Sequence, residues 1–218
     1  GYAMVLERIG RAAEAEALLR HSIVTAEGIR EHGGEPQMAV AVLRDNLATV
    51  LFQQGRLDEC QVEARAALAV YQGAAPDTTR GYNPAWRIAS CAYMQGQWET
   101  AGNHAELALG YALKGIPVGV INAERMLAAV AARRGEHSEA AQHLKRADAA
   151  IAGTDMAKSD VQTALLLTHA LAAAKRDDGA EARARLGAAE ARMEGTTPPR
   201  WLAQEHGEVA ALVTALGP

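Results

Sequence analysis

The chain has 218 residues, of which 49% are apolar and only 4% are aromatic, and its formal net charge is −4. A protein that grips nucleic-acid phosphates needs a basic surface, so this balance argues against direct nucleic-acid contact by the chain. The sequence holds no apolar run of about 18 residues, and it therefore predicts a soluble protein without a membrane span.

Four copies of a short phrase recur along the chain. They are IGRAAEAEAL from Ile9, QGRLDECQVEA from Gln54, QGQWETAGNHA from Gln95 and RGEHSEAAQHL from Arg134. Each copy places a Gly five residues before a small residue: Gly10 and Ala15, Gly55 and Cys60, Gly96 and Ala101, Gly135 and Ala140. Such a period is typical of a solenoid, because one unit cannot bury its apolar face alone and must stack on its neighbours.

The second copy shows how one unit is built. Leu43, Leu47 and Leu51 have helical spacing, the pattern stops at Gly55, and a second helical pattern begins at Leu57. Gly suits the left-handed conformation that ends a helix, and the acidic pair that follows favours the positive end of the next helix dipole. Each unit is therefore predicted to be two helices, A and B, with the Gly at the bend.

These positions resemble the tetratricopeptide repeat (TPR) family, which places a large and then a small apolar residue in helix A, Gly at the bend and small residues on helix B. Three units match this pattern well: Leu47-Ala48, Gly55, Cys60 and Ala67; Ile88-Ala89, Gly96, Ala101 and Ala108; Leu127-Ala128, Gly135, Ala140 and Ala147. The resemblance implies an all-α fold, a right-handed α-solenoid of about five helix-turn-helix units.

The predicted units occupy residues 1–30, 37–71, 82–115, 120–152 and 159–194 of a single domain, 1–218. The first unit matches from Tyr2 onward, and Gly33-Gly34 is predicted to be a turn after it. The fifth unit has Asp177 where the bend Gly belongs, and either Leu167 or His169 takes the large apolar position of its helix A. A capping helix is expected at 199–216, after a Thr-Thr-Pro-Pro run.

The units are longer than standard ones, since their bends fall roughly 39 to 45 residues apart, against about 34 in the family. This length is similar to the regulatory arrays of bacterial MalT/LuxR-type and SARP-type regulators, and the resemblance implies a regulatory or sensor role. The chain opens at Gly1 in what should be the middle of a helix A, so a fragment of a larger protein is expected. Its uncapped first unit offers a surface for a homo-oligomer.

Motifs for catalysis and metal binding are missing from the sequence. The seven His residues are scattered, no HExxH or Cys-x-x-Cys spacing occurs, and Asp177-Asp178 is predicted to be a solvated turn. We therefore expect no enzyme, no cofactor and no metal. Cys60 and Cys91 fall on small-residue packing positions of neighbouring units. We expect both to be buried apolar residues, and a redox pair or a metal site is the alternative. Without a disulfide framework or signal peptide, a cytoplasmic location is expected.

The family binds ligands on its concave face, which helix A lines. Transferring the family pattern position by position gives the candidate binding residues Asp45, Thr49, Asn83, Trp86, Arg87, Ser90, Tyr93, Asn122, Arg125 and Arg133.

Three kinds of side chain in this set suggest the chemistry of a ligand. Asn83 and Asn122 occupy equivalent positions, where their amides can hold the backbone of an extended peptide. Arg125 and Arg133 can take a carboxylate, and Trp86 can supply an apolar anchor with Tyr93. The set predicts a partner segment with an acidic group and an apolar side chain, although a solvated helix surface is the simpler explanation.

Two functions remain open. The first is a non-catalytic module that binds a protein or peptide segment as the regulatory or sensor part of a bacterial signalling or transcription-regulating protein. The second is a small-molecule receptor that encloses a metabolite, for which the loop from Tyr71 to Pro84 is long enough to close the groove. Two expectations concern stability: Leu at Ala101 or Ala140 overpacks a helix crossing, whereas Arg125→Glu leaves folding nearly intact.

Overall fold

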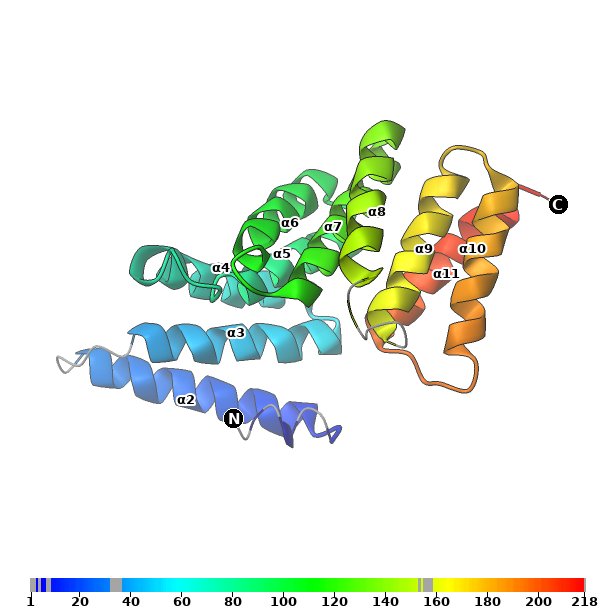
Figure 1. Cartoon of the computed structure of the whole chain (residues 1–218). Coiled ribbons are helices and arrows are strands. Elements are labelled where there is room, and N and C mark those ends of the chain that lie inside the picture. The colour runs from blue at the N-terminus through cyan, green and yellow to red at the C-terminus, as the bar shows by residue number, and fades with distance from the viewer. Residues whose placement is uncertain are drawn as a thin grey trace. The chain divides into compact units, whose positions relative to one another are not determined.

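The computed structural model describes residue 3, residues 5–6, 9–31, 37–152, 154 and 159–217. In this part of the chain the regular elements are ten α-helices, labelled α2 to α11 (Figure 1). The predicted match at Tyr2 and the predicted Gly33-Gly34 turn lie outside the described residues. None of the described helices is both long enough and apolar enough to cross a bilayer.

The helices fall into two compact units, Gly1–Gly115 and Ile116–Pro218. The helices of the first unit are α2 (Ala12–Glu31), α3 (Gln37–Gln54), α4 (Leu57–Ala74), α5 (Tyr82–Met94) and α6 (Trp98–Ala112). The helices of the second are α7 (Pro117–Arg134), α8 (His137–Ala152), α9 (Asp160–Ala174), α10 (Gly179–Met193) and α11 (Arg200–Ala215). Within each unit, helices that follow one another pack as pairs: α3 with α4, α5 with α6, α7 with α8 and α9 with α10. The expected all-α architecture of helix pairs is confirmed.

The bends between paired helices are left-handed, as the repeated Gly predicts. Gly55, Gly96 and Gly135 have φ of 78°, 73° and 79°. At the fifth bend Asp177 takes the same conformation, with φ of 60°, and Asp178 caps α10 by accepting a hydrogen bond from the Glu181 backbone N–H at 3.1 Å. Asp tolerates this region better than most residues, which explains how the pattern survives without Gly.

Small residues let the helices approach closely. Cys60, Ala101, Ala140 and Ala182 follow their bends by five residues, and all four are at most 2% exposed. A core with few aromatic side chains reaches normal packing density by such close contacts between helices. Gly81 is a tighter case, because a Cβ atom there would meet the Tyr111 ring at 2.3 Å.

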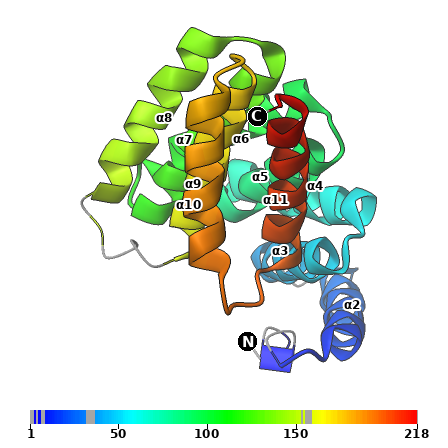
Figure 2. The same ribbon diagram turned by 90° about the vertical axis from the view of Figure 1, so that its right-hand side faces the viewer.

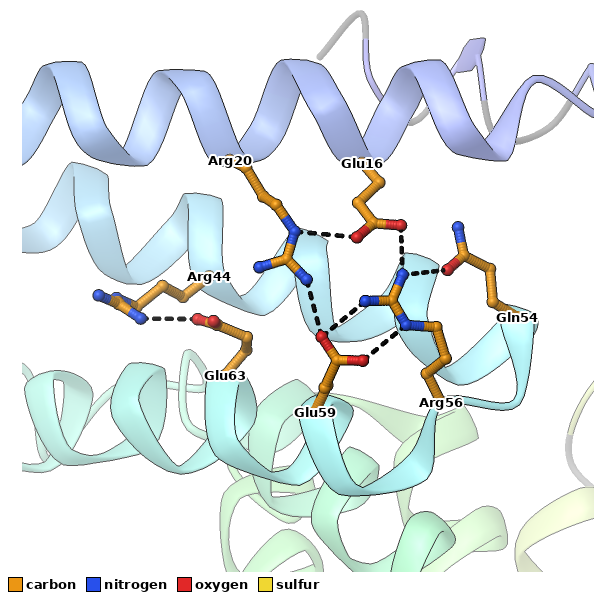
Figure 3. A network of polar contacts seen from close by, with 7 residues as sticks. All are labelled: Glu16, Arg20, Arg44, Gln54, Arg56, Glu59 and Glu63. Atoms are coloured by element: carbon orange, nitrogen blue, oxygen red, sulfur yellow. Dashed lines mark hydrogen bonds and ion pairs between the residues drawn. The ribbon is translucent and has the colours of Figure 1, made fainter.

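A network of ion pairs joins the B helices α2 and α4 on the surface of the first unit (Figure 3). The Arg56 guanidinium contacts Glu16 and Glu59 at 2.6 Å each, and Arg20 contacts the same two carboxylates at 2.9 Å each. Because the network begins at the α3–α4 bend, it links that bend to the preceding helix B. Exposed pairs of this kind are individually weak, so its contribution depends on the network as a whole.

The expected capping helix is α11. It packs mainly on α9 and less on α10, to which the loop at 194–199 joins it (Figure 2). The helix is therefore not placed evenly over the end of the last pair; it leans toward helix A of that pair.

Candidate functional site on the helix A faces

The candidate residues lie on helix A of successive pairs, at matching distances from the bend. Asp45 on α3, Trp86 on α5, Arg125 on α7 and Leu167 on α9 each precede their bend residue by ten positions. Seven of the ten candidates are on α3 and α5 of the first unit, and three are on α7 of the second unit. We call these surfaces the first and second helix A faces.

On the first helix A face, the structure brings Asp45, Thr49, Asn83 and Arg87 together. The Arg87 guanidinium donates a long 3.4 Å hydrogen bond to the Thr49 hydroxyl and lies 4.7 Å from the centre of the Phe52 ring. The Thr49 hydroxyl in turn donates to the Asp45 backbone carbonyl at 3.2 Å. Helices α3 and α5 thus share one polar cluster, as expected for neighbouring A helices.

The Asp45 carboxyl is incompletely satisfied. Burial raises its pKa to about 6, although the charge of Arg87 and a hydrogen bond with Asn83 act in the opposite direction. Its Oδ1 atom and the Nε atom of Arg87 are both buried without a hydrogen-bond partner in the described part of the chain. A buried donor and a buried acceptor without partners are costly, and the Nε atom of Arg125 on the second face is in the same state.

The other candidates on α5 differ in accessibility. Asn83 is exposed and Trp86 is partly exposed, so both can contact a ligand. Ser90 is buried and its hydroxyl donates to the Trp86 backbone carbonyl at 2.9 Å. Tyr93 is 8% exposed and packs edge-on against Trp98, with ring centres 5.3 Å apart. Ser90 and Tyr93 therefore support α5 from inside.

The second helix A face is occupied by the protein's own chain. Arg125 is 3% exposed, and its guanidinium donates to Glu205 of α11 at 2.7 Å and to the Thr168 hydroxyl of α9 at 3.3 Å. It also lies 5.9 Å from the centre of the Trp201 ring. Burial raises the pKa of Glu205, while the positive charge of Arg125 lowers it. The expectation that Arg125→Glu would spare the fold is therefore corrected, because the change would bury two acidic groups together.

Arg133 makes a similar contact closer to the surface. Its guanidinium contacts the Glu208 carboxylate of α11 at 2.6 Å. Glu205 and Glu208 are three residues apart, so they lie on one side of α11 and meet the two arginines of α7. The carboxylates that the sequence predicts in a partner are thus supplied by α11. Asn122 is partly exposed, and its binding role stays a prediction.

Packing of α11 on α9 also accounts for the departure of the fifth repeat from the pattern. Counting back from Asp177 places His169 at the large apolar position, where it is partly exposed and contacts Asp148 at 3.0 Å. Leu167 falls at the position of Asp45 and Arg125, yet it is fully buried. Its helix is the main contact of α11. The other helix A faces carry a polar or partly polar side chain at this position. The apolar Leu167 therefore indicates that this part of α9 is suited to packing against another helix.

Sequence reasoning missed Glu205 and Glu208 as partners of the candidate arginines. The available signal was Glu205, which shares the apolar stripe of the predicted capping helix with Leu202, Val209 and Val213, but a periodic pattern does not say which distant side chain pairs with it. No group of three or more His, Cys, Asp or Glu side chains suited to a metal occurs among the described residues. Buried His143 contacts Glu124 at 2.6 Å, within the core between α7 and α8.

The stacked helix pairs and left-handed bends define a TPR-like α-solenoid repeat protein. No family model matches the chain, and no curated protein matches it. Solved structures share its fold. BtubC (BKLC) from P. vanneervenii is 18% identical, with 94% of this chain and 84% of that chain covered, at a TM-score of 0.66.

Two further structures show the same likeness. A Podosopora anserina protein described as a putative kinesin light chain, with nearly identical TPR-like repeats, is 17% identical over 88% of this chain and 91% of that chain, at a TM-score of 0.67. A tetratricopeptide repeat protein from Parabacteroides merdae is 16% identical over 99% of this chain and 74% of that chain, at a TM-score of 0.60. These likenesses show that the chain has a TPR-like α-solenoid fold.

Proposed function

We propose that this module binds an extended segment of a partner protein on its first helix A face. The observation that carries the proposal is the difference in covering: Asn83 and Trp86 are accessible on α5, whereas Arg125 and Leu167 on the second face are buried. A helix A face is the surface that TPR-like folds use for peptides, and only the first face has its candidate polar and aromatic side chains accessible together.

The chemistry of the first face suits a peptide backbone. A peptide group carries one donor and one acceptor, which match the unpartnered Asp45 Oδ1 and Arg87 Nε atoms. Both atoms are covered in the free protein, so the two side chains must turn outward to reach the ligand. The exposed Asn83 amide can hold a second peptide group.

Two side chains give the proposed ligand its specificity. Trp86 offers an apolar platform of the kind that dominates interface energies. Arg87 can donate to an acidic group, although its guanidinium already contacts Thr49 and Phe52 and its charge acts on the Asp45 carboxyl. The proposed partner is therefore still an acidic segment with an apolar anchor. It would contact α3 and α5, and not the arginines of α7.

The cellular role that we propose is that of a regulatory or sensor part of a bacterial signalling or transcription-regulating protein in the cytoplasm, without catalysis of its own. Support comes from the long repeat spacing and from the resemblance to MalT/LuxR-type and SARP-type arrays. In such a protein, binding of a segment would be passed to a linked effector domain.

Affinity capture from a bacterial lysate tests the proposal. The bait is the wild-type chain, compared with Asn83→Ala/Trp86→Ala on the first face and Asn122→Ala/Arg133→Ala on the second. Proteins and small molecules retained by each bait are identified by mass spectrometry, and retained proteins are then tested by titration with their purified segments. We expect a protein that binds in titration and whose retention is lost with the first-face variant alone. Retention unaffected by that variant would contradict the proposed face, and a metabolite lost in the same way would favour a small-molecule receptor.

A further inference from the structure

The two cysteines of the chain meet inside the first unit. Cys60 lies in the first turn of α4 and Cys91 near the end of α5, and each is completely buried. Their Sγ atoms are 2.8 Å apart, although 31 positions separate the residues in the sequence. A disulfide bond is about 2.05 Å long, so the two sulfurs are already close to bonding distance.

The surroundings of the two thiols favour a bond to each other over a bond to anything else. Full burial excludes bulky oxidants from the native state, and the described residues provide no third ligand for a metal. Each sulfur has the other as its near neighbour, in the packing between helix B of one pair and helix A of the next. Packing alone does not require a cysteine here, because the position of Cys60 in the next unit is filled by Ala101, which is equally buried.

We propose that Cys60 and Cys91 are a redox-sensitive dithiol that closes to a disulfide between α4 and α5 under oxidising conditions. With oxidised glutathione as the oxidant, the thiolate of one cysteine displaces one glutathione and forms a mixed disulfide. The second cysteine then attacks the protein sulfur of that bond, releases the other glutathione and forms the Cys60–Cys91 bond. Two protein thiols are oxidised, one glutathione disulfide is reduced to two thiols, and both protons end on glutathione.

Access controls the rate of this reaction. The contact with Cys60, together with burial, raises the pKa of the Cys91 thiol, so the reactive thiolate is scarce in the closed structure. Oxidation therefore requires α4 and α5 to separate locally, and the pair responds to sustained oxidising conditions instead of a brief pulse. The bond would then fix α5, the helix that carries Asn83, Trp86 and Arg87, to its neighbour.

The test uses the purified chain in buffers of defined reduced and oxidised glutathione, followed by denaturation, thiol alkylation and intact-mass measurement. The expected product is a monomer that is two hydrogens lighter and takes up no alkylating reagent. Trypsin should release the peptide from Leu57 to Arg65 linked to the peptide from Ile88 to Lys114. The single variants Cys60→Ala and Cys91→Ala are matched controls, and they should give only glutathione adducts or dimers.

Two further readouts separate a native disulfide from one formed in unfolded chains. The oxidation rate should reach a plateau as oxidised glutathione is increased, because opening of α4 from α5 becomes limiting. The oxidised chain should melt roughly 5–15 °C higher than the reduced chain, and a reducing agent should reverse the shift. Persistent thiols in the most oxidising buffer, glutathione on both cysteines, or a lower melting temperature after oxidation would each overturn the proposal.

Discussion

The first and second helix A faces start from the same repeat pattern and end in different states. On α3 and α5 the positions at matching distances from the bend carry accessible polar and aromatic side chains. On α7 and α9 the residues ten positions before the bend, Arg125 and Leu167, are buried, while Asn122 stays partly exposed. Arg125 and Arg133 pair with Glu205 and Glu208 of α11. A repeat pattern therefore identifies the residues of a helix A face, but a helix outside the pattern decides whether that face is covered.

The largest expected effect is at the buried pair of the second face. Arg125→Ala leaves Glu205 buried without a counter-ion and should reduce the free energy of unfolding by about 3–5 kcal/mol. Arg87→Ala on the first face removes a long hydrogen bond, a ring contact and the positive charge that acts on Asp45, and should cost less, about 1–2 kcal/mol. Urea denaturation measures both. The double variant Arg125→Met/Glu205→Leu should recover most of the loss, and similar costs at Arg87 and Arg125 would break the comparison.

Helix packing should be alike in the two units, so that the units differ only in their helix A faces. Ala101 and Ala140 are almost completely buried at matching helix crossings, so Leu at either position should overpack the crossing and cost about 1–3 kcal/mol. Ala69→Leu at an exposed position of α4 is the control and should have little effect. Thermal unfolding of the three variants is the measurement. Unchanged melting of both core variants would show that the repeat register is wrong.

The unsatisfied carboxyl of the first face should make stability depend on pH. Asp45 has a folded-state pKa of about 6, above its usual value of 3.8, so between these values the folded protein holds a proton that the unfolded chain has released. Stability should therefore fall as pH rises from about 4 to 6, by about 3 kcal/mol at this site, and stay level above it. Asp45→Asn should lack this part of the fall in denaturation curves. An equal fall in wild type and variant would show that Asp45 is well solvated.

The bend at Asp177 differs from the others because it has no Gly, and a substitution there should increase the stability of the chain. A non-Gly residue with φ of 60° is strained, so Asp177→Gly should stabilise the chain by about 1 kcal/mol. Gly55→Ala, at a bend with φ of 78°, should destabilise it by a similar amount. Chemical denaturation of the two variants tests whether the bends share one conformation. A loss of stability in the Asp177→Gly variant would instead point to contacts of the Asp177 side chain.

The smallest effect is expected at the exposed pair of the second face. Arg133 contacts Glu208, whose side chain is 42% exposed, and removing such a pair should cost less than about 1 kcal/mol. Arg133→Ala should also make the second face easier to uncover, which amide hydrogen exchange of α11 can detect. Exchange in α11 that is the same in wild type and variant would show that the Arg133–Glu208 pair does not hold the helix in place.

The sequence was sufficient to predict the helix pairs and their bends, because these depend on local spacing: Gly55 and Leu57 identify a bend and a helix start within a few residues. It was not sufficient to predict the state of Arg125. That state depends on Glu205, which lies 80 positions away along the chain. Whether an arginine on a repeat faces solvent or a buried carboxylate is decided by packing of a helix that follows no repeat rule, and periodicity contains no information about it.

The most direct test is an amide hydrogen-exchange footprint of a bound peptide. A peptide selected from a displayed random library against the wild-type chain is added at saturation, and exchange is compared with that of the free protein. We expect slower exchange in α3 and α5, unchanged exchange in α7 and α11, and at least about tenfold weaker binding to Asn83→Ala/Trp86→Ala. Protection of α7 together with faster exchange of α11 would contradict the proposal, because it would mean that the peptide displaces α11 and that the second face is the binding site.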